Sequence, residues 1–176
     1  ENIRDIDPLT FLFFAINCII ILLVYPLLFV IEKLFGFTSN VTLIELSNIN
    51  NPLLRELAEK APGTFQHSMQ VSTLASEAAT RIKANPQLVR TAALYHDIGK
   101  MDDAPFFTEN QNGVNPHDKL TPQESAHIIT GHVEKGLELA DKFGLPESIR
   151  GFIASHHGKG VARYFYIKYN QAHPDL

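Results

Sequence analysis

The sequence has few of the residues that stabilise small secreted domains or attract nucleic acids. Its 176 residues include one cysteine, Cys18. A single cysteine has no partner in the chain, which excludes a disulfide-stabilised secreted domain. Acidic residues (19) outnumber lysine and arginine (15), and the net charge is -4. This balance excludes a strongly basic nucleic-acid-binding protein, and the absence of low-complexity tracts and repeats excludes a disordered or repetitive chain.

Charged side chains are missing from one long segment, residues 9–31, in which 20 of 23 residues are apolar. As a helix this segment would be about 35 Å long, enough to cross a hydrocarbon core of about 30 Å. We therefore predict a transmembrane helix over residues 9–31, after an N-terminal flank of residues 1–8. A signal peptide is disfavoured because the leading residues are not basic. A buried core helix of this length would normally show a polar face.

Two residues inside the apolar segment indicate that it packs against other helices. A side-chain amide in lipid, such as that of Asn17, requires a hydrogen-bonding partner. A proline such as Pro26 frees a backbone carbonyl that a neighbouring helix can satisfy. We therefore expect further transmembrane helices beside this one.

Helical signals dominate the rest of the sequence, after a predicted connector at residues 32–50. Asn51-Pro52 and Asn85-Pro86 each pair a capping residue with a proline at the first helical position. Thr64 is a further candidate cap, and Thr121 to Glu124 forms a capping box. The predicted helices span residues 53–60, 64–85, 86–96, 121–143 and 147–158, with Gly99 as a stop signal after the third. No strand-like alternation occurs, so we predict an all-α fold in which residues 101–120 form a loop.

Histidine is abundant, with eight residues at positions 67, 96, 117, 127, 132, 156, 157 and 173. Five of them lie at the ends or faces of four different predicted helices, which can hold metal ligands rigidly. These five, with the aspartate that follows one of them, are His67, His96, Asp97, His132, His156 and His157. Imidazole and carboxylate ligands suit Mn, Fe or Zn, and the two oxygens of Asp97 can bridge two metals.

Helix geometry restricts which histidines can act together. His127 and His132 are five residues apart and point about 140° away from each other, so one of them should face away from a site. His156 and His157 can serve one site only at a helix end or bend. His117 lies in a turn, where hydrogen bonding that shapes the loop is favoured. His173 lies in a predicted terminal tail without a fixed role.

The ordered set of histidines and Asp97 resembles the HD-domain metal-dependent phosphohydrolases. Further motifs resemble the membrane-anchored branch of that family, in which a seven-helix transmembrane region precedes the hydrolase. These motifs are Glu45 to Ser47, Asn51 to Arg55, Ala61 to Ser68, His96 to Lys100, Phe106 to Gln111 and Asn115 to Asp118. The resemblance covers nearly the whole chain.

That branch is known for cyclic di-AMP phosphodiesterases, which hydrolyse the second messenger to linear pApA. The resemblance implies two divalent transition metals, Fe or Mn, that activate a bridging hydroxide. One metal would take His67, His96 and Asp97, and the other would take Asp97, His132, His156 and His157. His96, Asp97 and Lys100 would form the catalytic group. Lys100 would steady a phosphate, or simply be a solvated loop lysine.

The loop and the surroundings of the domain follow from the same resemblance. Asn110, Gln111 and Asn115 would read the substrate or, equally, stiffen the loop. The expected partners are a cyclic dinucleotide, membrane lipid and other transmembrane helices, and no DNA or RNA polymer. The expected location is the bacterial inner membrane, with a cytoplasmic catalytic domain.

The resemblance also leaves two points open. The family normally adds a final aspartate ligand from a later helix, and Asp175 is a poor candidate in its tail. We therefore expect residues 51–176 to be an HD domain that is incomplete at its C-terminus, with an incomplete first metal site. The rival interpretations are an HD hydrolase for another nucleotide, and a catalytically impaired, membrane-tethered module that binds or senses a nucleotide.

Overall fold

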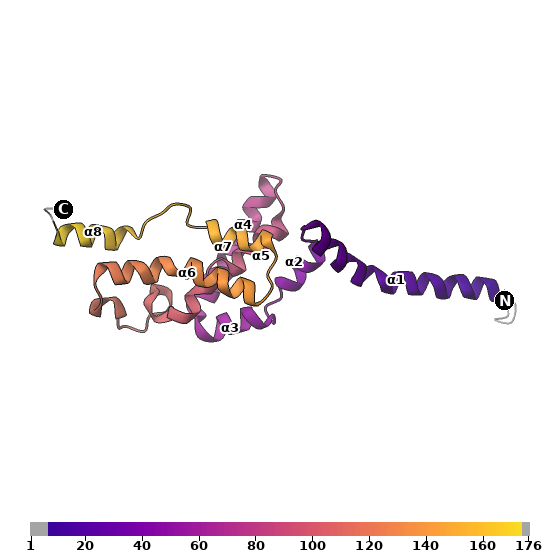
Figure 1. The fold of residues 1–176 in the computed structure, drawn as a ribbon, viewed down its shortest axis with the longest axis horizontal. Helices are drawn as coiled ribbons and strands as arrows, with labels where there is room; N and C mark the ends of the chain where they lie inside the picture. The colour runs from indigo at the N-terminus through magenta and orange to yellow at the C-terminus, as the bar shows by residue number, and fades with distance from the viewer. Residues whose placement is uncertain (1–6, 174–176) are drawn as a thin grey trace. The chain divides into compact units, whose positions relative to one another are not determined.

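The computed structural model describes residues 7–173, and every regular element in that range is helical (Figure 1). The predicted all-α fold is confirmed. The chain divides into two compact units, Glu1–Ser39 and Asn40–Leu176. The first unit contains a single long helix, and the second contains the remaining helices.

Helix α1 (Pro8–Phe35) contains the apolar segment and extends four residues beyond its predicted end. The carboxylate of Asp7 caps its start by accepting a hydrogen bond of 3.1 Å from the Leu9 N–H. Gly36 ends it in the left-handed conformation, at a φ of 68°. None of its residues is buried, and it is the one helix of the described chain that is long and apolar enough to cross a membrane.

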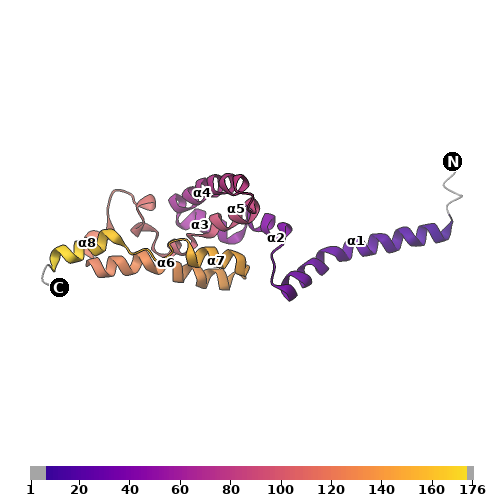
Figure 2. The same cartoon turned by 90° about the horizontal axis from the view of Figure 1, so that it is seen from above.

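In the described part of the second unit there are seven α-helices and three 3₁₀ segments, and Figure 2 shows the helices from above. The α-helices are α2 (Asn40–Leu46), α3 (Pro52–Lys60), α4 (Pro62–Arg81), α5 (Pro86–Tyr95), α6 (Pro122–Lys142), α7 (Glu147–Ser155) and α8 (Arg163–Ala172). The 3₁₀ segments are η2 (Ile98–Phe106), η3 (Thr108–Asn110) and η4 (Pro116–Lys119). The caps at Asn51 and Asn85 and the capping box of Thr121 and Glu124 are confirmed.

Some predictions about the elements were wrong. Residues 101–120, predicted as a loop, carry 3₁₀ turns, and α8 lies after residue 158, where no helix was predicted. Helix α2 lies within the predicted connector. Helix α4 begins at Pro62 instead of being capped by Thr64. The Thr64 N–H donates to the side chain of Asn110, so a residue distant in sequence satisfies the start of this helix.

Gly99 does not stop a helix but allows two backbones to approach closely. It lies in η2, where a Cβ atom would come within 1.8 Å of the His132 carbonyl oxygen on α6. Any larger side chain would push α6 away from the segment that follows α5. Gly99 therefore fixes the distance between two of the elements that carry the candidate ligands.

Helix packing brings the remaining ligand-bearing elements together. Helix α4 packs along α5 with a buried row of small polar residues at every fourth position, Thr64, Ser68, Ser72 and Ser76. Helix α7 packs on α5 and α6 through Ile149 and Ile153, which are fully buried. Helix α8 packs against α6. The ends of α5 and α7 and the middle of α6 consequently converge.

Candidate metal centre

Six side chains, from α4, from α6 and from the segments directly after α5 and α7, meet where α5 ends. Asp97 is buried there and belongs to two groups of potential metal ligands. We call Asp97, His132, His156 and His157 the inner cluster, and His67, His96 and Asp97 the outer cluster. Within each cluster, one ligand atom from every member lies within 4.8 Å of those of the other members.

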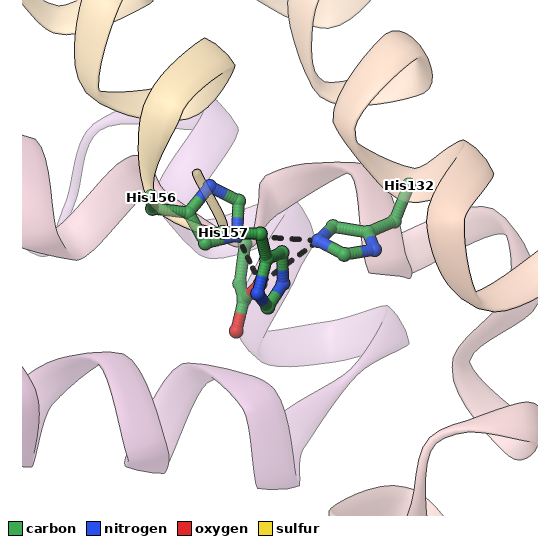
Figure 3. A group of neighbouring side chains, drawn as sticks. His132, His156 and His157 are labelled. Carbon is green, nitrogen blue, oxygen red and sulfur yellow. Dashed lines mark hydrogen bonds and ion pairs between the residues drawn. The ribbon is translucent and has the colours of Figure 1, made fainter. Parts of the chain in front are cut away.

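The paired histidines of the inner cluster both reach it because α7 ends at Ser155, immediately before them. Their ring centroids are 4.1 Å apart, and the His132 ring lies 5.4 Å from His156 and 5.0 Å from His157. Figure 3 shows the three rings gathered between α6 and the end of α7. We expected that His156 and His157 could serve one site only at a helix end or bend, and α7 does end immediately before them.

Three imidazoles are oriented by backbone carbonyl groups. The Nδ1 atoms of His96, His132 and His156 each contact the carbonyl oxygen three residues earlier. A carbonyl can only accept a hydrogen bond, so each Nδ1 carries the proton and donates it. In the neutral ring this leaves the Nε2 lone pair directed toward Asp97, which is the usual orientation of a histidine ligand.

The carboxylate of Asp97 is surrounded by these Nε2 atoms. His96 Nε2 lies 3.1 Å from Oδ2, while His132 Nε2 and His156 Nε2 each lie 3.4 Å from Oδ1. Oδ1 is buried and accepts no hydrogen bond. Nitrogen lone pairs that face a buried carboxylate oxygen repel it unless a proton or a metal ion lies between them. The donor set therefore fits a bound metal ion.

Comparison with known proteins places this centre in a family. The HD domain matches residues 64–174, a range that contains all six potential ligands. The chain belongs to the HD-domain family. Membership implies dependence on a divalent metal, in agreement with the two clusters.

The HD domain has close relatives of known activity. The cyclic-di-AMP phosphodiesterase PgpH of Listeria monocytogenes is 44% identical over 146 residues, which are 82% of this chain and 20% of that protein. PgpH of Bacillus subtilis is 41% identical over 138 residues, 78% of this chain and 19% of that protein. The chain thus spans about a fifth of the length of these curated relatives.

A solved structure supports the same comparison. The HD domain of L. monocytogenes PgpH in complex with cyclic-di-AMP matches with a TM-score of 0.70 and 45% identity. The match covers 73% of this chain and 61% of that one. The two domains therefore share their helical arrangement.

Electrostatics around Asp97 favour its ionised form. Burial alone would raise the pKa of Asp97, but the imidazoles of His156 and His96 and the Lys100 ammonium hold it well below its usual range. Lys100 Nζ lies 2.9 Å from Asp97 Oδ2, and its side chain is only 13% exposed. The Lys100 ammonium is therefore mostly buried and forms ion pairs with Asp97 and Glu109. The alternative that Lys100 is a solvated loop lysine is wrong.

The pKa shifts of His96, His132 and His157 differ in direction. Burial would lower the pKa of His96, but Asp97 raises it above the ordinary value. Burial lowers the pKa of His132, and burial together with His156 lowers that of His157. The inner cluster thus contains imidazoles that favour the neutral form required for metal binding.

The other histidines lie away from the clusters. His127 is exposed, so the prediction that one member of the pair at 127 and 132 faces away is confirmed. His117 is buried and its Nε2 donates a 3.0 Å hydrogen bond to the Phe106 carbonyl, as expected for a residue that shapes the loop. His173 stacks on Tyr169 at the end of α8 instead of lying in a tail. Asp175 falls outside the described residues.

The three amides predicted for substrate binding are engaged within the protein. Asn110 bonds to Thr64 at the start of α4. Gln111 donates a 3.3 Å hydrogen bond to Asn115, which also caps η4. Sequence reasoning assigned no role to Glu109, which lies within the same motif and contacts Lys100. The motif from Phe106 to Gln111 marked this segment as part of the family resemblance, but the contact between Glu109 and Lys100 is visible only in the folded structure.

Proposed function

We propose that this chain forms the hydrolytic part of a metal-dependent phosphodiesterase that converts cyclic di-AMP to linear pApA. The observation that carries the proposal is the convergence of three oriented imidazoles on the two oxygens of Asp97. Such a shared carboxylate suits two neighbouring divalent metals. The substrate is suggested by the PgpH relatives and by the cyclic-di-AMP complex of the similar HD domain.

The inner cluster would hold one metal and the outer cluster the other, with Asp97 shared between them. Bound metals supply Lewis-acid stabilisation of phosphate charge and activation of water. We propose Fe or Mn, because imidazole and carboxylate ligands suit both. The carbonyl groups behind His96, His132 and His156 keep each ring in the tautomer and orientation that ligation requires.

The reaction is a hydrolysis in which the oxygen of water bonds to phosphorus and the bond from phosphorus to the ribose 3′-oxygen breaks. The departing 3′-oxygen takes a proton, and the product carries a 5′-phosphate and a free 3′-hydroxyl. Lys100 would contact a non-bridging phosphate oxygen, a role supported by its ammonium lying 2.9 Å from Asp97 Oδ2. Gln111 and Asn115 remain candidates for contacts with the base or ribose, while Asn110 supports them through the loop.

The proposed organisation is an N-terminal flank (1–8), a transmembrane helix (9–31), a connector (32–50) and an HD domain (51–176). The length and composition of α1 support membrane insertion in a bacterial cell membrane, with further transmembrane helices as neighbours. We propose that the HD domain faces the cytoplasm, where a cyclic dinucleotide messenger is found. Resistance of the chain to extraction from membranes by alkaline carbonate would support insertion, and release would contradict it.

Turnover assays test the proposed substrate. The purified chain, loaded with Mn²⁺ or Fe²⁺, should convert cyclic di-AMP to pApA faster than it hydrolyses cyclic di-GMP, a nucleoside monophosphate or a short RNA. Faster hydrolysis of one of the others would replace the substrate but keep the reaction class. Binding of cyclic di-AMP without any hydrolysis would favour the nucleotide-sensing module instead.

A further inference from the structure

Glu109 occupies a position between the start of α4 and the metal centre. One oxygen, Oε1, accepts a hydrogen bond of 2.9 Å from Lys100 Nζ and one of 3.1 Å from the Thr64 hydroxyl. Lys100 Nζ lies at the same distance, 2.9 Å, from Asp97 Oδ2. The ammonium is therefore held between two carboxylates, one belonging to both ligand clusters and one to neither.

The turn that carries Glu109 is itself fixed against α4. Asn110 accepts a 3.1 Å hydrogen bond from the Thr64 N–H, and its amide donates one of 2.8 Å to the Thr64 hydroxyl. A Cβ atom on Gly63 would lie 1.9 Å from the Glu109 carbonyl oxygen, so the two backbones are in contact. His67 follows one helical turn after Thr64. Glu109 is thus anchored to the helix that carries a ligand of the outer cluster.

We propose that Glu109 is a positioning residue that acts through Lys100. A lysine side chain has four rotatable bonds and loses conformational entropy when its ammonium is fixed. The Glu109 carboxylate favours the one arrangement in which the ammonium faces Asp97. Its negative charge also balances Lys100, so that Asp97 keeps its own charge for the metals. Phe107, whose ring lies 4.9 Å from Lys100 Nζ, covers another side of the ammonium.

This inference rests on the proposed function, because Lys100 must contact the substrate phosphate for its position to matter. Glu109→Gln keeps the shape of the side chain and removes its charge. We expect kcat/KM for cyclic di-AMP to fall about 10-fold to 100-fold, the usual effect of removing a group that orients a functional residue. The metal content should remain that of the unaltered chain. Glu59→Gln is the matched control, since Glu59 is exposed and its ion pair with Arg55 is 3.8 Å long.

A double-mutant cycle separates this role from a merely structural one. Lys100→Met should lower kcat/KM at least as much as Glu109→Gln, and adding Glu109→Gln to it should cause no further loss. Calorimetry should show the same pattern for binding of a hydrolysis-resistant phosphorothioate analogue of cyclic di-AMP. Its affinity should fall in each single variant and should not fall further when Glu109→Gln is added to Lys100→Met. Independent, multiplying losses in the two variants would overturn the inference.

A milder variant keeps the test decisive if Glu109→Gln does not fold. Thr64→Val removes the hydroxyl that orients Glu109 but leaves both charges in place. It should lower kcat/KM a few-fold in the unaltered chain and not at all in the Lys100→Met chain. An equal loss in both chains would contradict the inference.

The substrate proposal and this inference fail in different ways. If the chain hydrolyses bis(p-nitrophenyl) phosphate but not cyclic di-AMP, the substrate proposal is wrong, and the same cycle on the simple diester still decides the role of Glu109. If cyclic di-AMP is hydrolysed and the cycle shows independent losses, only the inference is wrong. If the metal-loaded chain hydrolyses neither diester, the proposed hydrolysis is wrong, and the calorimetric cycle with the phosphorothioate analogue decides the role of Glu109: independent losses of binding would overturn the inference.

Discussion

The inner and outer clusters share Asp97 but differ in how firmly their other members are held. The inner cluster contains a buried histidine, His132, which lies on α6 and is 3% exposed. His156 of the inner cluster and His96 of the outer cluster are each oriented by a carbonyl, and His157 of the inner cluster is exposed. His67 of the outer cluster is exposed. Preorganised, buried ligands lose less entropy on binding, so the inner cluster should bind its metal more tightly. Two sites in one centre can therefore differ in affinity although they share a ligand.

The largest expected effect is the loss of both metals when the shared ligand is removed. Asp97→Ala should reduce metal content to near zero and lower turnover by roughly a thousand-fold or more, because each metal contributes several kcal/mol of charge stabilisation. Elemental analysis and turnover of the purified variant check this. Asp141→Ala is the control, since that carboxylate forms a surface ion pair with Arg150. Retention of one metal by Asp97→Ala would show that the clusters do not share Asp97.

Removing one histidine from each cluster should separate their affinities. His132→Ala should abolish the tighter site and leave weak metal binding at the outer cluster. His67→Ala should abolish the weaker site and leave the tighter one, as measured by Mn²⁺ titration followed by electron paramagnetic resonance. His127→Ala, on an exposed face of the same helix as His132, should leave both sites unchanged. Tighter binding at the outer cluster would reverse the comparison.

Local signals in the sequence predicted most of the helices. A cap such as Asn51 or Asn85 acts on backbone groups two or three residues away, so its effect does not depend on the rest of the fold. The same reason explains why α8 was missed: its cap position, Ala162, offers no side-chain hydrogen bond. Because there was no start signal, no helix was predicted for residues 163–172.

Contacts between segments that are distant in the sequence could not be predicted from local sequence signals. The start of α4 is satisfied by Asn110, 46 residues later in the chain. Gly99 resembled a helix stop but serves the close approach of α6. For the centre, the residue types indicated a metal site, and the grouping into two clusters came from the family resemblance. The hydrogen bond that Lys100 donates to Glu109 depends on the folded loop, so no spacing rule could predict it.

A smaller effect concerns protonation in the metal-free chain. The ordinary imidazole pKa is about 6.5. The His96 imidazole should titrate above that value, because of Asp97, and those of His132 and His157 below it, because of burial. Since a ligand must be deprotonated, falling pH should protonate the outer cluster first and release its metal first. NMR titration of the ring protons checks the order, and titration of His132 above His96 would contradict it.

The smallest effect tests whether the clusters depend on the connector. The buried Tyr95 hydroxyl donates a 2.7 Å hydrogen bond to the Leu46 carbonyl at the end of α2, and Tyr95 directly precedes His96. Tyr95→Phe should lower the free energy of unfolding by about 1 to 2 kcal/mol, because the buried carbonyl loses a donor. Urea unfolding of the metal-free chain measures this. If α2 also holds the end of α5 in place, metal affinity should fall slightly at the outer cluster, whose His96 directly follows α5, and less at the inner cluster, whose histidines lie on α6 and after α7. An equal fall at both would indicate that the bond acts through Asp97, the ligand that they share.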